Sequence, residues 1–183
     1  THNNPYFVFN ISPDLFINTS IALIIILYAY FSKIIKEIEL FLFLASVLLV
    51  FVIPFILPAK YLGDQIPYTN FTRELKLGII PETGFITLYS SYIYSLLPLP
   101  SPSSVASFSM YNKILLIISL IYLKKNSYID KYTLIILLIF PSLLLYSSLA
   151  LREMLVFTLM VIWLILILNK KYIFAIICIG LFV

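Results

Sequence analysis

The stretch LREMLVFTLMVIWLILILNKKY, residues 151–172, decides the fold class of this 183-residue chain. Its interior carries no charge, and charged pairs close it at both ends: Arg152 with Glu153, and Lys170 with Lys171. A helix rises 1.5 Å per residue, so about 20 apolar residues are needed to cross the hydrocarbon core of a bilayer. The stretch therefore predicts a membrane-spanning helix.

The composition of the whole chain agrees with this prediction. Hydrophobic residues make up 62% of the chain and charged residues 11%, and the mean hydropathy is +1.08. A soluble domain has about 25% charged residues, so we expect an integral membrane protein. The net charge of +4 then concerns orientation in the bilayer and not nucleic acid. With Cys178 and His2 each the single residue of its type, we expect no disulfide, no metal site and no cofactor.

Six apolar stretches are candidate spans, and short polar connections separate them. They are residues 15–31, 40–58, 105–123, 132–149, 151–168 and 172–183. The third is the weakest, because Asn112 and Lys113 interrupt it and Lys113 would have to snorkel to the nearer surface. The sequence lacks an initiator methionine and stops inside an apolar run. We therefore expect a single, incomplete transmembrane domain over residues 1–183, an all-α polytopic bundle of about six helices.

Residues 84–97 have helical periodicity but two chemically different faces. One face is apolar and aromatic: Phe85, Leu88, Tyr89, Tyr92, Ile93, Leu96 and Leu97. The other carries mostly hydroxyls: Thr87, Ser90, Ser91, Tyr94 and Ser95. Such an amphipathic helix either lies in the membrane interface or crosses with its hydroxyl face lining a polar cavity. In the second case bulky substitutions on the hydroxyl face should impair activity, and substitutions on the apolar face should lower protein abundance.

The distribution of lysines favours the arrangement in which residues 84–97 do not cross. Seven of the twelve basic residues then share one side: Lys33, Lys36, Lys124, Lys125, Lys131, Lys170 and Lys171. Arg152 lies on the opposite side with Lys60, Arg73, Lys76, Lys113, Asp14, Asp64, Glu74, Glu82 and Glu153. By the positive-inside rule the lysine-rich side is cytoplasmic. The N-terminus and one long segment with the amphipathic helix, residues 59–104, are then external.

Arg152 has two interpretations at the outer end of its span. It could snorkel to the headgroups. Alternatively, it faces inward and binds an anion that arrives in the plane of the bilayer, because a guanidinium binds phosphate oxygens in a bidentate way and stays charged. The charged residues of the external segment are likewise either solvated or functional. Span geometry alone does not choose between these interpretations.

Three motifs in this part of the chain resemble the EpsG/Wzy-type polysaccharide polymerases. They are GDQIPYTNF at 63–71, PETGFITLYSSYIYSLL at 81–97 and LREMLVFTLMVIWLILILNKKYIFAI at 151–176. The matching positions are Asp64, Tyr68 and Phe71; Glu82, Gly84 and Phe85; and Leu151 and Arg152. Thr83 replaces the usual proline, and Glu153 stands where glutamine is commoner. The match covers residues 61–174 in the family's order, and the histidine motif that the family often shows would lie beyond Val183.

The resemblance implies a membrane glycan polymerase that joins oligosaccharide units linked to polyprenyl diphosphate, at the outer face of the cytoplasmic membrane. It implies Glu82 or Asp64 as the base that activates a sugar hydroxyl, and Arg152 as the cation for the lipid diphosphate. Further binding residues are expected to be Arg73, Lys76, Tyr68, Phe71 and Tyr92. Its partners would be the lipid-linked oligosaccharide, membrane lipids and other membrane proteins of polysaccharide assembly.

Other classes of membrane protein stay open at this point. A transporter or flippase would also be polytopic, although it would more often carry ionisable residues near the bilayer centre. A respiratory-type membrane subunit would share the composition without glycosyl transfer, and a purely structural subunit would need no site.

Overall fold

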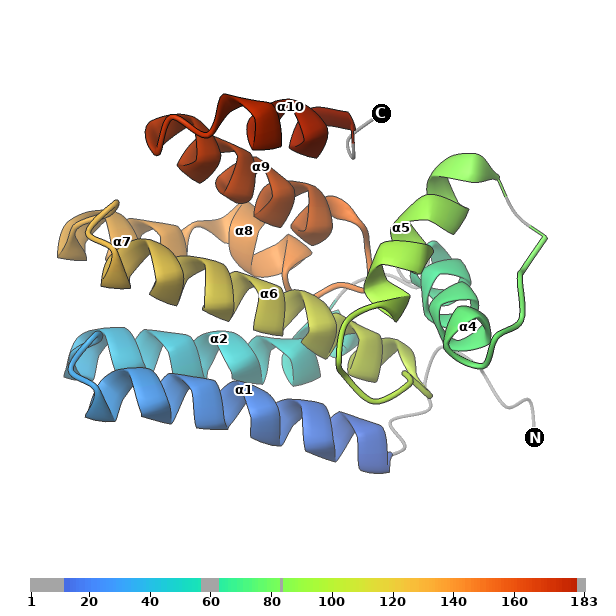
Figure 1. The fold of residues 1–183 in the computed structure, drawn as a ribbon. Coiled ribbons are helices and arrows are strands. Elements are labelled where there is room, and N and C mark those ends of the chain that lie inside the picture. The colour runs from blue at the N-terminus through green and yellow to red at the C-terminus, as the bar shows by residue number, and fades with distance from the viewer. Residues whose placement is uncertain (1–11, 57–62, 83, 181–183) are drawn as a thin grey trace.

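The computed structural model describes residues 12–56, 63–82 and 84–180 (Figure 1). Every regular element in these ranges is a helix. The helices are α1 (Pro13–Phe31), α2 (Glu37–Ile56), α4 (Gln65–Lys76), α5 (Phe85–Ser95), α6 (Val105–Lys125), α7 (Lys131–Ile139), α8 (Pro141–Tyr146), α9 (Glu153–Leu168) and α10 (Tyr172–Gly180). The all-α prediction is confirmed for the described residues.

Some predictions fall partly outside these ranges. The last residues of the predicted spans 40–58 and 172–183 do so, as does the beginning of the predicted external segment 59–104. Thr83, the position that departs from the family's motif, also lies outside the described residues.

Helix α6 occupies the centre of the bundle. It packs against α1, α2 and α9, and its residues from Ser107 to Ile114 are all buried. Helix α1 lies beside it, α2 contacts both, and α10 packs on α9 at the edge of the molecule (Figure 1). The span expected at residues 105–123 is therefore the central helix, in spite of the polar residues that interrupt it.

The helices differ in their ability to cross a membrane. By length and composition, α1 and α6 are long and apolar enough to do so, and α9 is apolar but has only 16 residues. Helix α2 has 20 residues, which corresponds to about 30 Å of rise. The described part of the chain therefore has two clear candidate spans, fewer than the six expected from the sequence.

The prediction of one continuous helix over residues 132–149 is wrong. Helix α7 ends at Ile139, Phe140 is extended (φ −67°, ψ 116°), and α8 covers only six residues. Pro141 is the cause: proline lacks an N–H for the helix ladder and disfavours helical geometry in the residue before it. The break leaves an irregular segment, residues 147–152, between α8 and α9.

The described surface is apolar around the helices, and polar groups are enclosed between them. Large side chains such as Phe16, Ile24 and Phe31 on α1 are more than 60% exposed, and α10 exposes a similar face. The buried polar residues include Asn18, Glu39, Ser46, Gln65, Thr69, Thr72, Ser90, Ser91, Ser107, Ser109, Asn112, Lys113, Ser119, Ser147 and Ser148. A protein surrounded by water rarely exposes so continuous an apolar surface.

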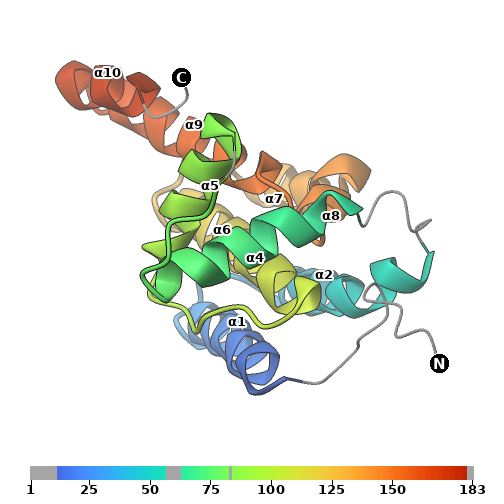
Figure 2. The same cartoon turned by 90° about the vertical axis from the view of Figure 1, so that its right-hand side faces the viewer.

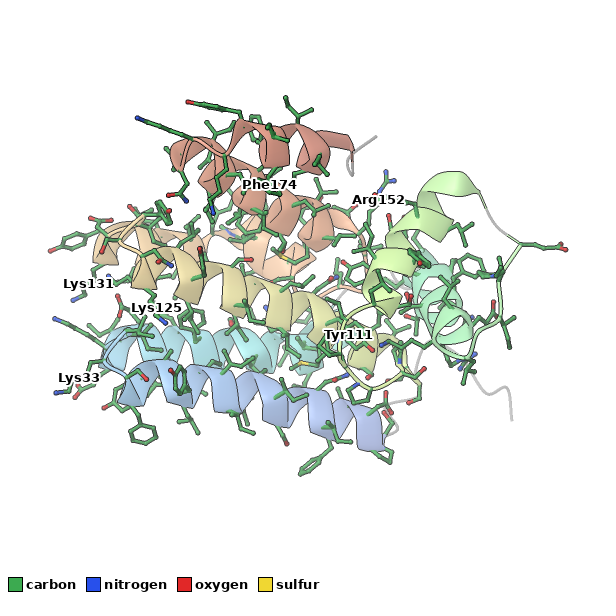
Figure 3. The ribbon with its side chains drawn as sticks, viewed as in Figure 1. Lys33, Tyr111, Lys125, Lys131, Arg152 and Phe174 are labelled. Carbon is green, nitrogen blue, oxygen red and sulfur yellow. The ribbon has the colours of Figure 1, made fainter. Side chains whose placement is uncertain are left out.

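The two ends of the bundle are chemically distinct. Figure 3 shows Lys33, Lys125 and Lys131 at one end, far from Tyr111 and Arg152. We call the first the lysine end and the second the arginine end. Helices α4 and α5 lie across the arginine end, as the view in Figure 2 shows. This arrangement agrees with the separation of charges expected if residues 84–97 do not run alongside the spans.

Three turns at the lysine end share one geometry. The α1–α2, α6–α7 and α9–α10 connections each contain a residue with positive φ: Lys33 (58°), Ser127 (59°) and Lys170 (58°). In each case the next residue donates its N–H to a carbonyl five positions back, as Ile34 does to Ala29 at 2.9 Å. This is the Schellman cap, which satisfies the last carbonyls of a helix and reverses the chain.

Candidate functional site

The irregular segment 147–152 forms the centre of the arginine end. The hydroxyls of Ser147 and Ser148 donate to the carbonyl of Leu144 at 3.1 and 2.8 Å, and thereby compete with continuation of α8. Residues 147–150 are all buried. Buried backbone outside a helix must find hydrogen-bond partners elsewhere, and side chains of three other helices supply them.

Asn112 of α6 provides the most extensive support. Its Nδ2 donates to the carbonyls of Leu149 and Leu151 at 2.6 and 2.7 Å. Its Oδ1 accepts a hydrogen bond from the hydroxyl of Tyr94 on α5. Asn112 and Tyr94 are both fully buried, and burial raises the pKa of Tyr94, so this hydroxyl stays a donor. One amide thus connects α6, α5 and the segment that leads into α9.

Two further side chains hold the same segment. The Oε1 of Gln65, at the start of α4, accepts from the N–H of Ala150 at 2.6 Å. The Nζ of Lys113 donates to the hydroxyl of Ser147 at 2.7 Å. Lys113 is fully buried, so the expectation that it snorkels to the surface is wrong. The reason is local: α6 is central, and Ser147 offers an acceptor inside the bundle.

Arg152 follows this supported segment directly and immediately precedes α9. It is partly exposed, and its side chain does not cap the helix. With the partners that the structure describes, its guanidinium makes no hydrogen bond or ion pair. Figure 3 shows it at the end of α9 that lies toward α5. A guanidinium beside the start of a helix can attract anions, although the carboxylate of Glu153 in the first turn of α9 offsets part of this positive charge.

The two candidate bases lie on the same end of the molecule but are not brought together. Asp64 directly precedes α4 and is exposed; Glu82 lies in the α4–α5 connection and is also exposed. Neither contacts Arg152 through a hydrogen bond or an ion pair among the described residues. The structure therefore shows separate carboxylates on one end of the bundle, and not an assembled acid–base pair.

The basic residues of α4 are both engaged locally. Arg73 donates to the Oδ1 of Asn70 at 3.2 Å. The Nζ of Lys76 donates to the carbonyls of Leu97 and Leu99 at 2.8 and 2.9 Å, and burial lowers the pKa of Lys76. Leu97 and Leu99 lie in the connection between α5 and α6. Prolines in this connection supply no N–H donors for its carbonyls, and Lys76 donates to two of these carbonyls instead.

The three aromatic candidates differ in exposure. Tyr68 packs against a cluster formed by Tyr94, Phe108, Tyr111, Ala150 and Leu155, next to the start of α9. Phe71 is partly buried on α4. Tyr92 on α5 is 52% exposed. Of these candidates, Tyr68 is linked through its packing to the segment beside Arg152.

The amphipathic helix is present, and its orientation is now defined. Ser91 and Tyr94 on the hydroxyl face are fully buried, whereas Tyr92 and Leu96 on the apolar face are 52% and 66% exposed. The hydroxyl face therefore packs inside the protein and does not line an open groove in this structure. The Oγ of Ser91 and the Oγ1 of Thr72 on neighbouring α4 are buried with no hydrogen-bond partner among the described residues.

Sequence reasoning missed the residues that hold the 147–152 segment: Gln65, Tyr94, Asn112 and Lys113. A signal was present for two of them, because Asn112 and Lys113 interrupt an apolar run. Polar and ionisable residues inside a span usually face the bundle interior and mark function. Their acceptors, the carbonyls of Leu149 and Leu151 and the hydroxyl of Ser147, had no sequence signal.

Comparisons with known proteins give no further assignment. No family model, no curated protein and no solved structure matches this chain. Among the described residues, no group of three or more His, Cys, Asp or Glu side chains could hold a metal ion. The arginine end is therefore interpreted from its chemistry and from the motif resemblance alone.

Proposed function

We propose that this chain is part of a membrane glycan polymerase whose donor, an oligosaccharide linked to polyprenyl diphosphate, binds at the arginine end. The observation that carries the proposal is the Arg152 guanidinium, without a hydrogen bond or ion pair to any described residue, on a segment fixed by Asn112 and Gln65. Because the backbone before Arg152 is held from α6 and α4, the point at which its side chain is attached is fixed, and the guanidinium stays available to a ligand. A cation at this place would stabilise a departing diphosphate.

The surface of the bundle supports a lipid-linked donor. The exposed apolar faces of α1, α9 and α10 fit a protein surrounded by acyl chains. A polyprenyl tail could then stay in the bilayer while its diphosphate reaches Arg152 at the boundary. A water-soluble nucleotide sugar would need no such surface.

In the proposed reaction, a sugar hydroxyl of one lipid-linked glycan attacks the anomeric carbon of another. The bond between that carbon and the phosphate oxygen breaks, and the lipid diphosphate leaves with the bonding electrons. A carboxylate accepts the hydroxyl proton, for which Glu82 is the first candidate and Asp64 the second. Both are exposed on the arginine end, so their approach to the reacting hydroxyl would follow donor binding.

Transport is a second candidate, and one observation favours it. Lys113 is an ionisable side chain buried well inside α6, with the Ser147 hydroxyl as its hydrogen-bond acceptor. Intramembrane lysines commonly mark ion or substrate pathways. Against this candidate, Arg152 and both carboxylates lie at the end of the bundle. Solute flux into sealed vesicles would separate the two functions: flux that Lys113→Met abolishes favours transport, and polymer formation without flux favours the polymerase.

The decisive experiment replaces Arg152 in the full-length protein. A lysine keeps the charge but loses the bidentate fork, and a charge-assisted hydrogen bond contributes about 1.5–3 kcal/mol. Arg152→Lys and Arg152→Ala should therefore both lower the rate of polymer formation by roughly ten- to hundredfold. The measurement is glycan chain length in cells that lack the native protein and produce each variant at matched abundance.

Glu153→Gln is the matched control, because the side chain is exposed and points about 100° away around the helix. Its effect should be mild. Full-length polymer from Arg152→Lys would make this arginine a membrane-surface anchor and overturn the proposal.

The proposed membrane crossing has a separate test. Because Thr69 is buried, single cysteines are introduced at Leu77, which follows α4 on the arginine end and is 67% exposed, and at the exposed Ser127 on the lysine end, in a Cys178→Ser background. Membrane-impermeant reagent should label each from a different side of sealed vesicles. Labelling of both from one side would contradict the proposed topology, whatever the enzymatic result.

A further inference from the structure

A groove of about 630 Å³ opens at the lysine end between the α1–α2 turn and the start of α7. Lys33, Lys36 and Lys131 line it together with one acidic residue, Glu37. Three ammonium groups against one carboxylate give a net charge of +2. Lys33 and Lys36 are exposed, and among the described residues none of the three lysines forms an ion pair.

The acidic groups near the groove offset this charge only in part. Glu39 is buried, accepts from the Lys36 backbone N–H at 2.7 Å and pairs with Lys124 at 3.5 Å. Asp130, beside Lys131, keeps its negative charge; it accepts from the Thr133 N–H at 2.8 Å and forms no ion pair with a groove lysine among the described residues. The groove therefore stays net positive, and its lysines are available to an anion from outside.

The groove is also apolar on the side that continues along the helices. Phe31 is 76% exposed and Ile38 is 57% exposed, and both line it. Further exposed apolar side chains extend from these two along α1 and α2: Ile24, Leu27, Tyr28, Phe41 and Leu48. A ligand that fills the groove and follows this surface must have a negative head and an apolar tail.

We propose that this groove binds the phosphate headgroup of an anionic phospholipid from the surrounding leaflet. Lys33, Lys36 and Lys131 contact the phosphate, and the acyl chains lie on the surface that begins at Phe31 and Ile38. Clusters of basic residues at the cytoplasmic edge of membrane helices attract anionic lipids. The inference depends on the proposed membrane crossing, and it does not depend on glycan transfer.

The test measures lipid retention on the full chain by native mass spectrometry, with phosphatidylglycerol and phosphatidylcholine of equal acyl length as probes. The unmodified protein should retain phosphatidylglycerol at least tenfold better than phosphatidylcholine. Lys33→Asn combined with Lys131→Gln should weaken phosphatidylglycerol binding about 20-fold, since each lysine near the surface contributes about a fivefold factor. Asparagine is chosen at position 33 because it tolerates the positive φ found there.

The matched control removes two charges at the same end but outside the groove, with Lys170→Asn, at the same positive φ as Lys33, and Lys171→Gln. It should weaken binding by less than threefold. Glu37→Gln is expected to strengthen binding severalfold, a gain that damage to the fold would not produce. Equal weakening by both double variants would reduce the effect to diffuse charge and overturn the proposal. Release of the lipid by millimolar inorganic phosphate would show a site for free anions and would also overturn it.

Discussion

The three helix–helix turns of the lysine end and the α8–α9 connection of the arginine end are held in opposite ways. At the lysine end, three short turns use local backbone hydrogen bonds, and most of their charged side chains point into solvent. At the arginine end, the backbone of residues 147–151 depends on Gln65 and Asn112, which are distant in sequence. The first arrangement is self-sufficient, whereas the second exists only when α4 and α6 are packed in place.

This difference indicates where the molecule can carry chemistry. A turn that satisfies its own hydrogen bonds needs nothing from the rest of the fold and can vary freely. A buried irregular segment held by several helices is costly to maintain, because every unmade hydrogen bond there destabilises the fold. Under the proposed function, this cost is offset because the segment leads directly to Arg152.

The strongest test of the contrast is Asn112→Ala. It removes the hydrogen bonds of Asn112 to the carbonyls of Leu149 and Leu151 and to the hydroxyl of Tyr94, and leaves the bond from that hydroxyl to the Leu151 carbonyl at 3.2 Å. At about 1 kcal/mol for each lost hydrogen bond, the free energy of unfolding should fall by about 3 kcal/mol. The measurement is unfolding by SDS in mixed micelles.

Asn126→Ala is the control from the lysine end, where the exposed amide only donates to the carbonyl of Tyr122 at 2.9 Å. It should cost less than about 0.5 kcal/mol. Similar losses for the two variants would mean that the arginine end is no more dependent on its side chains than the lysine end.

A second test compares one substitution at two positions of α5. Ser91 is fully buried and Ser95 is partly exposed one turn later. Ser91→Leu should destabilise the protein by about 2 kcal/mol because it overpacks the α4–α5 interface, and Ser95→Leu should change stability little. Protein abundance in membranes and unfolding in mixed micelles both report the difference. If Ser95→Leu proved the more damaging, the orientation of α5 described here would be wrong.

The third test concerns the self-sufficient turns. Ser127 has a φ of 59°, which is unfavourable for a residue with a Cβ. Ser127→Gly removes this cost, but glycine has more conformational freedom in the unfolded chain, which opposes the gain. The net effect should be a stabilisation of about 0.5–1 kcal/mol. Gly78, with a φ of 77°, allows the reverse: Gly78→Ala should cost about 1 kcal/mol. Destabilisation by Ser127→Gly would contradict the cap geometry.

The smallest expected effect is the pH dependence of stability that Asp130 produces at the start of α7. Hydrogen bonds from the side chain and backbone of Thr133 hold the pKa of Asp130 below its ordinary value of 3.8. A carboxyl group with a lowered folded pKa stabilises the fold above pH 3.8, and the contribution is lost as pH falls through the folded pKa. Asp130→Asn should flatten the decline in stability between pH 5 and pH 3. An unchanged slope would show that this cap contributes nothing measurable.

The sequence was sufficient for the features that depend on local pattern. The length of apolar runs located α1 and α6, periodicity located the amphipathic α5, and the lysine pattern separated the two ends. Apolar content alone predicts one continuous helix over residues 132–149, and the break at Phe140 follows only when the effect of Pro141 is included. The burial of Lys113 and the partners of the 147–151 backbone could not be derived, because they depend on which helices become neighbours.

The turns at the lysine end also bear on the order in which the chain acquires its structure. Their hydrogen bonds join residues three to five positions apart, so the α1–α2, α6–α7 and α9–α10 hairpins can form as each pair of helices emerges. The bond between Gln65 and Ala150 closes a loop of 85 residues, and closure of long loops is slow. We expect the helical hairpins to assemble first and the segment before Arg152 to become ordered last. Pulse-labelling by hydrogen exchange should then protect the Tyr128 amide well before the Ala150 amide.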